Sequence, residues 1–300
     1  MTTRALVLGG GGPVGIAWES GLIAGLARGG VDLGQADFIM GTSAGAFVGA
    51  RLAFGEPAAT LADPILAEPP PAPRPEGQAR PASGPPPADL SVLVKMMAEA
   101  QGGVRDPQEV RAEIGAFALA AQTPDEATFI QSFGRSFAGL PEDAWPERGY
   151  ACSAVDALTG EFRMWTKESG VGVTRAVASS CSVPGVYPPV TIQGRRYIDG
   201  GMRSTINADQ AVGHDLVVVV QVRGAATAGA AAQAMAARVE AELDVLRKDG
   251  AQVLLIGPDE GSQAAMGLNL MDFRKLADAA RAGLAQGLAQ AENLKAVWAG

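Results

Sequence analysis

Histidine and cysteine are scarce in this chain. Its 300 residues include one histidine, His214, and two cysteines, Cys152 and Cys181. Two cysteines and one histidine are too few for a disulfide framework or a metal cluster. We therefore expect no metal site and no other cofactor, and we expect Cys181 to be a small buried residue rather than a reactive thiol.

Long apolar runs and an excess of basic residues are also missing. No stretch approaches the ~20 consecutive apolar residues of a membrane-spanning helix. The apolar run at 5–8 passes directly into glycines instead of continuing as the core of a signal peptide, which favours a cytoplasmic protein. The net charge of −8 argues against nucleic acid as a partner and against electrostatic docking on anionic lipid.

A glycine-flanked serine lies where a predicted strand turns into a predicted helix. The apolar run 38–40 is typical of a buried strand, and 46–54 carries small and apolar residues at helical spacing. Between them stands Gly41-Thr42-Ser43-Ala44-Gly45, in which the glycines let a tight turn close. The amides at the start of the helix favour negative charge at this place. The pattern predicts that Ser43 is a nucleophile.

A glycine-rich loop follows another predicted strand, 4–8. Its sequence is Gly9-Gly10-Gly11-Gly12-Pro13-Val14-Gly15, and a helical pattern follows. A Walker phosphate loop is excluded because the lysine and hydroxyl residues at its end are missing. A dinucleotide fingerprint fits the glycine spacing, but the acidic residue expected after the second strand is replaced by the serine turn. An oxyanion hole explains why loop and serine end neighbouring parallel strands.

Two residues are candidates for the base that a serine nucleophile needs. The order Ser43, Asp199, His214 is that of an α/β-hydrolase triad, but the motifs lie too near the N-terminus for the sheet of that fold. His214 also fits a simple turn before the apolar strand 216–222. Asp199 is the better candidate, because it ends a short predicted strand and is followed by Gly200 and Gly201.

These motifs, in this order, resemble those of the patatin-like phospholipases, serine acyl hydrolases with a Ser-Asp dyad. The segment 178–190, which precedes the aspartate, belongs to the resemblance. It implies a three-layer α/β/α sandwich with a mainly parallel central sheet. It also implies roles for individual residues: Ser43 as nucleophile, Asp199 as base, the amides of Gly10, Gly11 and Gly12 as oxyanion hole, and Gly15, Gly41, Gly45, Gly200 and Gly201 as motif glycines.

The chain departs from the family pattern in the residues just before the last glycine of the loop. Family members often carry a basic residue there, whereas this chain has Pro13-Val14. Pro13 has no N–H and cannot be an oxyanion donor itself. The change bears on recognition of an anionic head group more than on acyl transfer.

We expect one domain over 1–300, with an insertion between the two candidate catalytic residues. Residues 56–88 hold more than half of the chain's 20 prolines and predict an extended, mobile surface segment, either a linker or a flap. Residues 89–148 predict a helical insertion or lid. Further expected elements are hairpins at 150–155/161–165 and 190–192/196–198, strands at 216–222 and 253–256, and helices at 173–180, 228–249 and 272–298.

The predicted function is hydrolysis of a lipid or other acyl ester through an acyl-enzyme, with at most transient contact with a membrane surface. Two alternatives stay open: a nucleotide-binding α/β protein that uses the loop Gly10–Gly15, and a catalytically silent scaffold with the same fold. The sequence carries no signal for acyl-chain preference, head-group preference or oligomeric state.

Overall fold

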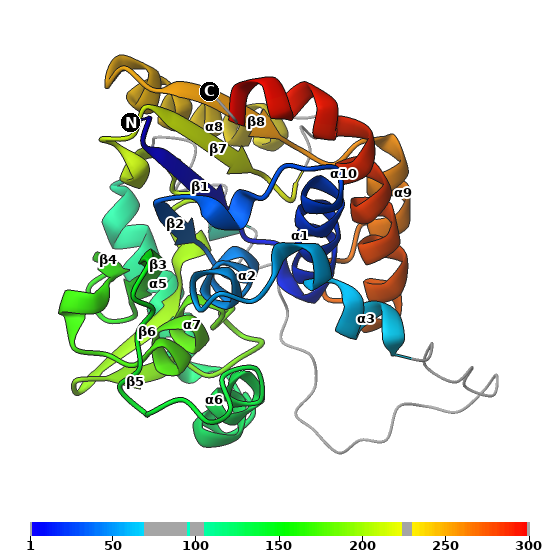
Figure 1. The fold of residues 1–300 in the computed structure, drawn as a ribbon. Coiled ribbons are helices and arrows are strands. Elements are labelled where there is room, and N and C mark those ends of the chain that lie inside the picture. The colour runs from blue at the N-terminus through cyan, green and yellow to red at the C-terminus, as the bar shows by residue number, and fades with distance from the viewer. Residues whose placement is uncertain (1, 69–94, 97–104, 224–229, 299–300) are drawn as a thin grey trace.

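An eight-stranded sheet forms the centre of the structure (Figure 1). It is seen in a computed structural model that describes residues 2–68, 95–96, 105–223 and 230–298. The strands run in the order β5-β6-β3-β2-β1-β7-β8, and β4 pairs with β3. Their bounds are β1 Arg4–Leu8, β2 Phe38–Gly41, β3 Gly149–Asp156, β4 Phe162–Trp165, β5 Val190–Ile192, β6 Arg195–Asp199, β7 Leu216–Val220 and β8 Gln252–Ile256.

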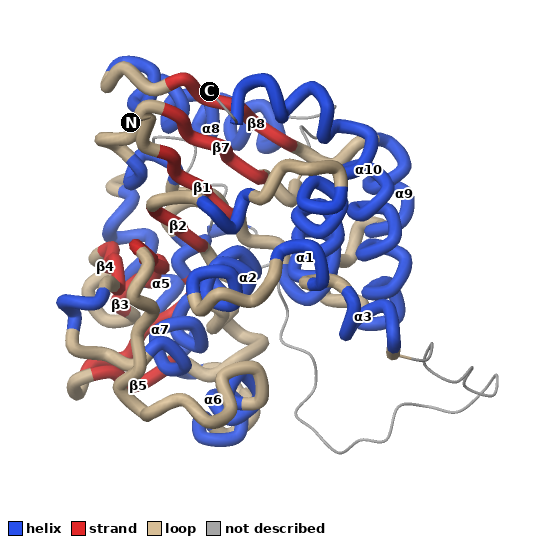
Figure 2. The backbone as a smooth tube through the Cα atoms, viewed as in Figure 1, coloured by secondary structure: helices blue, strands red, loops and turns tan. Residues whose placement is uncertain are grey.

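Five neighbouring strands, from β3 to β8 along this order, are parallel, while β4, β5 and β6 pair antiparallel. Helices cover the sheet, as the tube view makes clear (Figure 2). They are α1 Gly12–Arg28, α2 Ala44–Ala53, α3 Asp63–Ala67, α5 Pro107–Ala120, α6 Glu126–Gly134, α7 Val173–Ser180, α8 Ala230–Lys248, α9 Glu260–Met266 and α10 Leu276–Trp298. The expected α/β fold with a mostly parallel sheet is confirmed.

Successive side chains of β1 point to opposite faces of the sheet and belong to two separate core layers. Leu6 and Leu8 belong to the cluster that includes buried residues of α1, α2 and α10. Ala5 and Val7 point to the opposite face and join buried residues of α8. Because β1 is covered on both faces, all four side chains are fully buried.

The helices α1 and α10 approach each other through glycines. A Cβ atom on Gly21 would lie 2.1 Å from the carbonyl oxygen of Ala280, and one on Gly283 would lie 2.3 Å from the carbonyl oxygen of Trp18. Only residues without a side chain fit such a contact between two backbones. Since α1 begins in the glycine-rich loop, this packing also fixes where that loop lies.

The segment after α2 differs from the expectation. Residues 56–68 form a 3₁₀ turn, Ala58–Thr60, and the short helix α3 instead of an extended, mobile stretch. Leu61 and Ala62 are fully buried, and the Arg51 guanidinium donates to the Leu61 carbonyl at 3.2 Å. The prediction is therefore wrong for 56–68, because apolar residues between the prolines reach the core. The remainder, 69–88, lies outside the described residues.

The helical region predicted over 89–148 contains α5 and α6 in its described part. The two helices pack in different places: Val110 and Ile114 of α5 contact Val155 and Ile198 of the sheet, while α6 lies against α7. The hairpins and the helices after residue 149 match their predicted positions, but α9 was not predicted. Among the helices that the structure describes, none has the length and apolarity needed to cross a bilayer.

Gly21→Ala is expected to lower the free energy of unfolding by about 1–3 kcal/mol, because the new methyl group forces α1 and α10 apart. Urea unfolding of the variant and the wild type measures this change. Gly134→Ala in α6 is the matched control, since a Cβ atom there meets nothing within 4 Å. Equal losses in both variants would contradict the close packing of α1 on α10.

Candidate active site

Ser43 occupies a strained turn between β2 and α2. Its backbone angles are φ 53° and ψ −114°, in a region that L-residues rarely adopt. The flanking glycines are required by the same turn. A Cβ atom on Gly41 would lie 2.3 Å from the Gly45 carbonyl oxygen, and one on Gly45 would lie 2.2 Å from the Leu8 carbonyl oxygen. The local sequence thus holds a serine side chain at the carboxyl end of β2.

The end of α7 holds this turn from the other side. The backbone amide of Ser43 donates to Oγ of Ser180 at 2.9 Å, and the Cys181 thiol donates to the Ser43 carbonyl at 3.1 Å. Sequence reasoning did not assign these roles to Ser180 and Cys181. The segment 178–190, which contains both residues, was part of the family resemblance. Its contact with the distant Ser43 turn cannot be predicted from one sequence.

Asp199 is the last residue of β6 and is 2% exposed. Its backbone amide donates to the Ser182 carbonyl at 3.0 Å, and its Oδ1 atom accepts a hydrogen bond of 2.7 Å from the Gly201 amide. Gly200 is needed at the turn, because a Cβ atom there would lie 2.2 Å from Oγ of Ser153. These contacts fix the carboxyl group inside the protein.

Ser43 and Asp199 meet in this buried place. Burial raises the pKa of Asp199 to about 7, while hydrogen bonding from the Ser43 side chain and the Gly201 amide acts in the opposite direction. The hydrogen bond from the Ser43 side chain places the hydroxyl against the carboxyl group, which also accepts the 2.7 Å bond from the Gly201 amide. Contacts of this kind commonly tighten when substrate binds.

The glycine-rich loop passes beside Ser43. A Cβ atom on Gly10 would lie 3.3 Å from Cβ of Ser43, and one on Gly11 would lie 2.3 Å from Val222. The Gly10 amide donates to the Thr205 carbonyl at 2.7 Å, so it does not point freely toward a ligand. Among residues 2–68, 105–223 and 230–298, no protein acceptor receives the amides of Gly11 and Gly12.

Gly15, the last glycine of the motif, has a packing role. Its amide donates to the Gly11 carbonyl at 2.8 Å, in the first turn of α1. A Cβ atom there would lie 3.1 Å from the Val222 side chain and 3.4 Å from Cβ of Ala44. The glycine therefore lets α1 approach the start of α2 closely.

A buried polar network joins the serine turn to the aspartate turn. The Nδ2 atom of Asn207 lies 2.7 Å from the Ser204 carbonyl, 3.0 Å from Oγ1 of Thr42 and 3.3 Å from the Gly200 carbonyl. Oγ1 of Thr42 also lies 2.9 Å from Oγ of Ser153. Asn207 was missed by sequence reasoning, since no pattern around it distinguishes it from an ordinary turn residue.

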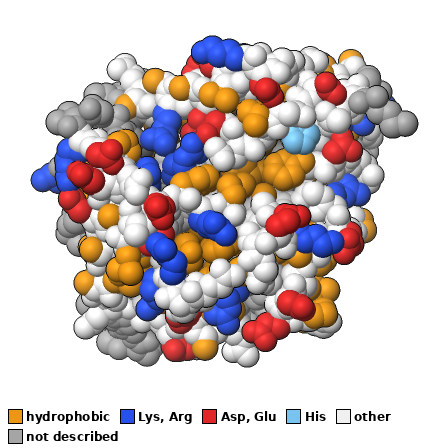
Figure 3. Space-filling view, turned by 90° about the vertical axis from the view of Figure 1, so that its left-hand side faces the viewer, with side chains coloured by type: hydrophobic (Ala, Val, Ile, Leu, Met, Phe, Trp, Pro, Cys, Tyr) orange, Lys and Arg blue, Asp and Glu red, His pale blue; other side chains and the backbone are white. Residues whose placement is uncertain are grey.

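His214 lies away from these residues. It precedes β7, whose first residue, Leu216, pairs with Arg4 at the amino end of β1, whereas Ser43 follows the carboxyl end of β2. The imidazole stacks on Phe38 with 5.4 Å between ring centroids, and Nδ1 lies 3.1 Å from the Ala211 carbonyl. Figure 3 looks onto this edge of the molecule, where the one histidine lies at the end of an apolar strip, beside an acidic side chain. The triad alternative is therefore excluded.

Burial disfavours the charged form of three other titratable groups near the site. Burial raises the pKa of Cys181 well above its ordinary value and that of Cys152 to about 12. In α1, burial raises the pKa of Glu19 well above its ordinary value, although the nearby backbone of Gly9 lowers it in part. No well-formed hydrogen bond reaches either carboxyl oxygen of Glu19 from the described residues.

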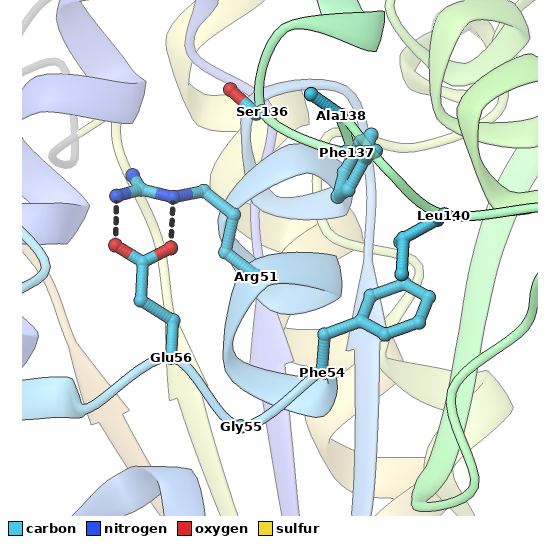
Figure 4. Close-up of a pocket in the computed structure, with 8 residues that line it drawn as sticks. All are labelled: Arg51, Phe54, Gly55, Glu56, Ser136, Phe137, Ala138 and Leu140. Carbon is cyan, nitrogen blue, oxygen red and sulfur yellow. Dashed lines mark hydrogen bonds and ion pairs between the residues drawn. The ribbon is translucent and has the colours of Figure 1, made fainter.

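Two cavities of about 340 Å³ each lie beside α2, and neither is lined by Ser43 or Asp199. The Arg51–Glu56 ion pair borders both, and Figure 4 shows it on the left of the first cavity, with Phe54, Phe137 and Leu140 on the right. The second cavity is lined by Ile16, Phe47, Arg51, Glu56, Pro64, Ile65 and Ser136. Phe47 stands one helical turn after Ser43, so this mostly apolar cavity begins close to the serine turn.

Asp199→Asn is expected to raise the free energy of unfolding at pH 8. Because the pKa of the folded state, about 7, exceeds the unfolded value of ~3.9, stability conferred by the protonated carboxyl is present below pH ~4 and is lost as pH rises to about 7. The uncharged amide avoids this loss, a gain on the order of 2–4 kcal/mol. Urea unfolding at pH 5 and pH 8 measures it.

Asp156→Asn is the control with the opposite sign. Burial raises the pKa of Asp156, but hydrogen bonds from Arg195 and from the amides of Thr159 and Leu158 outweigh burial and lower it. The charged form is therefore the stabilising one, and Asp156→Asn should lower stability at pH 8. Loss of stability in Asp199→Asn as well would contradict a raised pKa at Asp199.

Residues 114–212 match the family model described as patatin-like phospholipase. The match confirms the resemblance over that part of the chain, which includes Asp199 but neither Ser43 nor the glycine-rich loop, and it supports a lipid hydrolase. No curated protein matches the chain.

Among solved structures, VipD from Legionella pneumophila is similar with a TM-score of 0.49 and 14% identity, over 98% of this chain and 67% of that chain. The type III effector protein ExoU is similar with a TM-score of 0.36 and 16% identity, over 97% of this chain and 53% of that chain. This chain thus spans about half the length of the ExoU chain.

Proposed function

We propose that this protein is a serine acyl-ester hydrolase acting on lipid, with Ser43 as nucleophile and Asp199 as general base. The single observation that carries the proposal is a strained serine next to a buried carboxyl whose pKa is raised to about 7. The family match over residues 114–212 supports lipid as the substrate class.

The first half of the reaction forms an acyl-enzyme. Asp199 accepts the proton of the Ser43 hydroxyl as Oγ attacks the ester carbonyl carbon, and a tetrahedral intermediate forms. A free aspartate, with a pKa of ~3.9, is a weak base near neutral pH. A pKa of about 7 makes the proton transfer much more favourable while leaving much of the group ionised at neutral pH.

The second half returns the enzyme to its starting state. Collapse of the intermediate breaks the ester bond, and protonated Asp199 gives its proton to the departing alkoxide. Asp199 then accepts a proton from water as the water attacks the acyl-serine carbonyl. Breakdown of the second intermediate releases the fatty acid, and the proton returns from Asp199 to Oγ of Ser43.

The amides of Gly11 and Gly12 are the donors that we assign to the oxyanion. They lie in the loop beside Ser43 and have no protein acceptor in the described part of the chain. The Gly10 amide, expected from the sequence to be a third donor, instead anchors the loop on Thr205. Losing one oxyanion donor typically lowers turnover about 10²–10³-fold, so this loop matters as much as the base.

The acyl chain is assigned to the cavity bordered by Ile16 and Phe47. These residues stand one helical turn after Gly12 and Ser43, so an acyl group on Ser43 can extend between α1 and α2 toward Pro64 and Ile65. An apolar lining suits a hydrocarbon chain because its burial is favourable by about 0.8 kcal/mol per methylene.

No observation favours nucleotide binding at the loop Gly10–Gly15. The segment Leu270–Met271 lies against the loop: a Cβ atom on Gly12 would be 2.9 Å from the Leu270 carbonyl oxygen and from Sδ of Met271. This backbone lies close to where the loop would have to admit a pyrophosphate.

Ser43→Ala and Asp199→Asn are each expected to lower hydrolysis of a short-chain nitrophenyl ester at least about 10³-fold, because one removes the nucleophile and the other the base. A fluorophosphonate probe should label the wild type at Ser43 and should not label Ser43→Ala. Chromogenic assay and peptide mapping give the two readouts. His214→Ala is the matched control and should retain activity, since the imidazole lies at the opposite edge of the sheet. A folded wild type without hydrolysis or labelling would instead indicate the catalytically silent scaffold.

The pH profile of kcat/KM should have an acidic limb with a midpoint near pH 7. Asp199 must be ionised to accept the serine proton, so activity falls as pH decreases through its pKa of about 7. Initial rates between pH 5 and 9, at pH values where the fold is intact, measure the limb. A flat profile down to pH 5 would exclude Asp199 as a base with this raised pKa.

A further inference from the structure

The loop between α9 and α10 exposes two large apolar side chains. Leu268 is fully exposed and Phe273 is 60% exposed. The loop begins at Gly267, which ends α9, and runs into the 3₁₀ turn Phe273–Lys275 ahead of α10. Exposed apolar groups gathered on one short segment indicate a surface that meets an apolar partner.

The loop has a defined shape. Leu270 is buried, so its side chain anchors the loop in the core. Oδ1 of Asn269 accepts from the Met271 amide at 3.1 Å, and the side chain of Asp272 accepts from the Arg274 amide at 3.1 Å. Because the backbone is held between these bonds, Leu268 and Phe273 are presented outward rather than folded back.

The same loop lies against the glycine-rich loop. The Val14 amide donates to the Leu270 carbonyl at 3.1 Å, and a Cβ atom on Gly12 would lie 2.9 Å from Sδ of Met271. The exposed leucine and phenylalanine therefore belong to the loop that borders the proposed site. A partner that covers them would lie on the same side of the molecule as the glycine-rich loop.

We propose that the segment 267–275 docks this protein on the surface of a zwitterionic phospholipid bilayer, with Leu268 and Phe273 inserted among the lipids. The proposal rests on the proposed function, since a lipid hydrolase must bring its site to the surface that holds its substrate. It goes beyond that function because it assigns the docking element and the kind of membrane.

Charge favours a zwitterionic over an anionic bilayer. The chain carries a net charge of −8, which anionic lipids repel. Within the docking segment, Arg274 is 80% exposed and pairs with Asp272, and Lys275 follows. This local pattern places a few charges of both signs at the head groups, beside two apolar side chains that reach deeper.

Vesicle binding tests the proposal with Leu268→Gln and Phe273→Gln, each made in the Ser43→Ala background so that vesicle lipid is not consumed. Flotation with phosphatidylcholine vesicles should show about tenfold weaker partitioning for each substitution, because each removes one inserted apolar side chain. Added phosphatidylserine should weaken binding further. Leu288→Gln in α10 is the matched control: Leu288 is 48% exposed but lies about 18 Å along the helix from its start, and its substitution should leave binding unchanged.

Activity on two substrates, in the Ser43-containing protein, separates docking from chemistry. Leu268→Gln and Phe273→Gln should hydrolyse a monomeric short-chain ester like the wild type and should lose activity about tenfold on phosphatidylcholine vesicles. Equal loss on both substrates would overturn the docking role, because the loop would then act through the glycine-rich loop. Equal vesicle binding by all variants would overturn it too. A wild-type dimer that Leu268→Gln dissociates would also overturn it, because the two side chains would then contact a second copy of the chain. Leu268-dependent vesicle binding without any ester hydrolysis would support docking while removing the proposed function.

Discussion

The burial of one carboxyl group beside a strained serine is the constraint on which the site depends. Asp199, at the end of β6, is only 2% exposed, and burial raises its pKa to about 7. Ser43 is held in a backbone conformation that costs energy and that only the surrounding contacts can maintain. A buried carboxyl with a raised pKa and a serine in a strained turn are both unfavourable for stability, and in the proposed mechanism both favour acyl transfer.

The rest of the architecture serves to keep these two groups in place. The serine turn is held by Ser180 and Cys181 from α7, and Asn207 joins that turn to the aspartate turn. The glycine-rich loop is fixed on one side by the Thr205 carbonyl and on the other by Leu270. These supports come from the ends of strands and helices. They therefore hold the glycine-rich loop and the serine turn in a fixed geometry.

Much of the fold was predictable because local patterns were strong. The strand–glycine loop–helix unit and the strand–serine turn–helix unit follow from apolar runs that end in glycines, and a Cβ on Gly45 would indeed meet the backbone of β1. The stretch 56–68 was mispredicted because proline content outweighed the buried Leu61. The short helix α9 has no clear apolar period. The hydrogen bond of the Gly10 amide to Thr205 and the bonds of Asn207 to Thr42 and Gly200 join distant segments of the chain. Such contacts cannot be predicted from a single sequence.

Titration of the Asp199 carboxyl tests the central claim most directly. Carbon-13 NMR of protein labelled at the aspartate carboxyl carbon would follow each aspartate with pH, and Asp199→Asn identifies the resonance. The account predicts one resonance that titrates near pH 7 and whose midpoint shifts when a fluorophosphonate occupies Ser43. A midpoint near the ordinary value of ~4, unaffected by the probe, would contradict it.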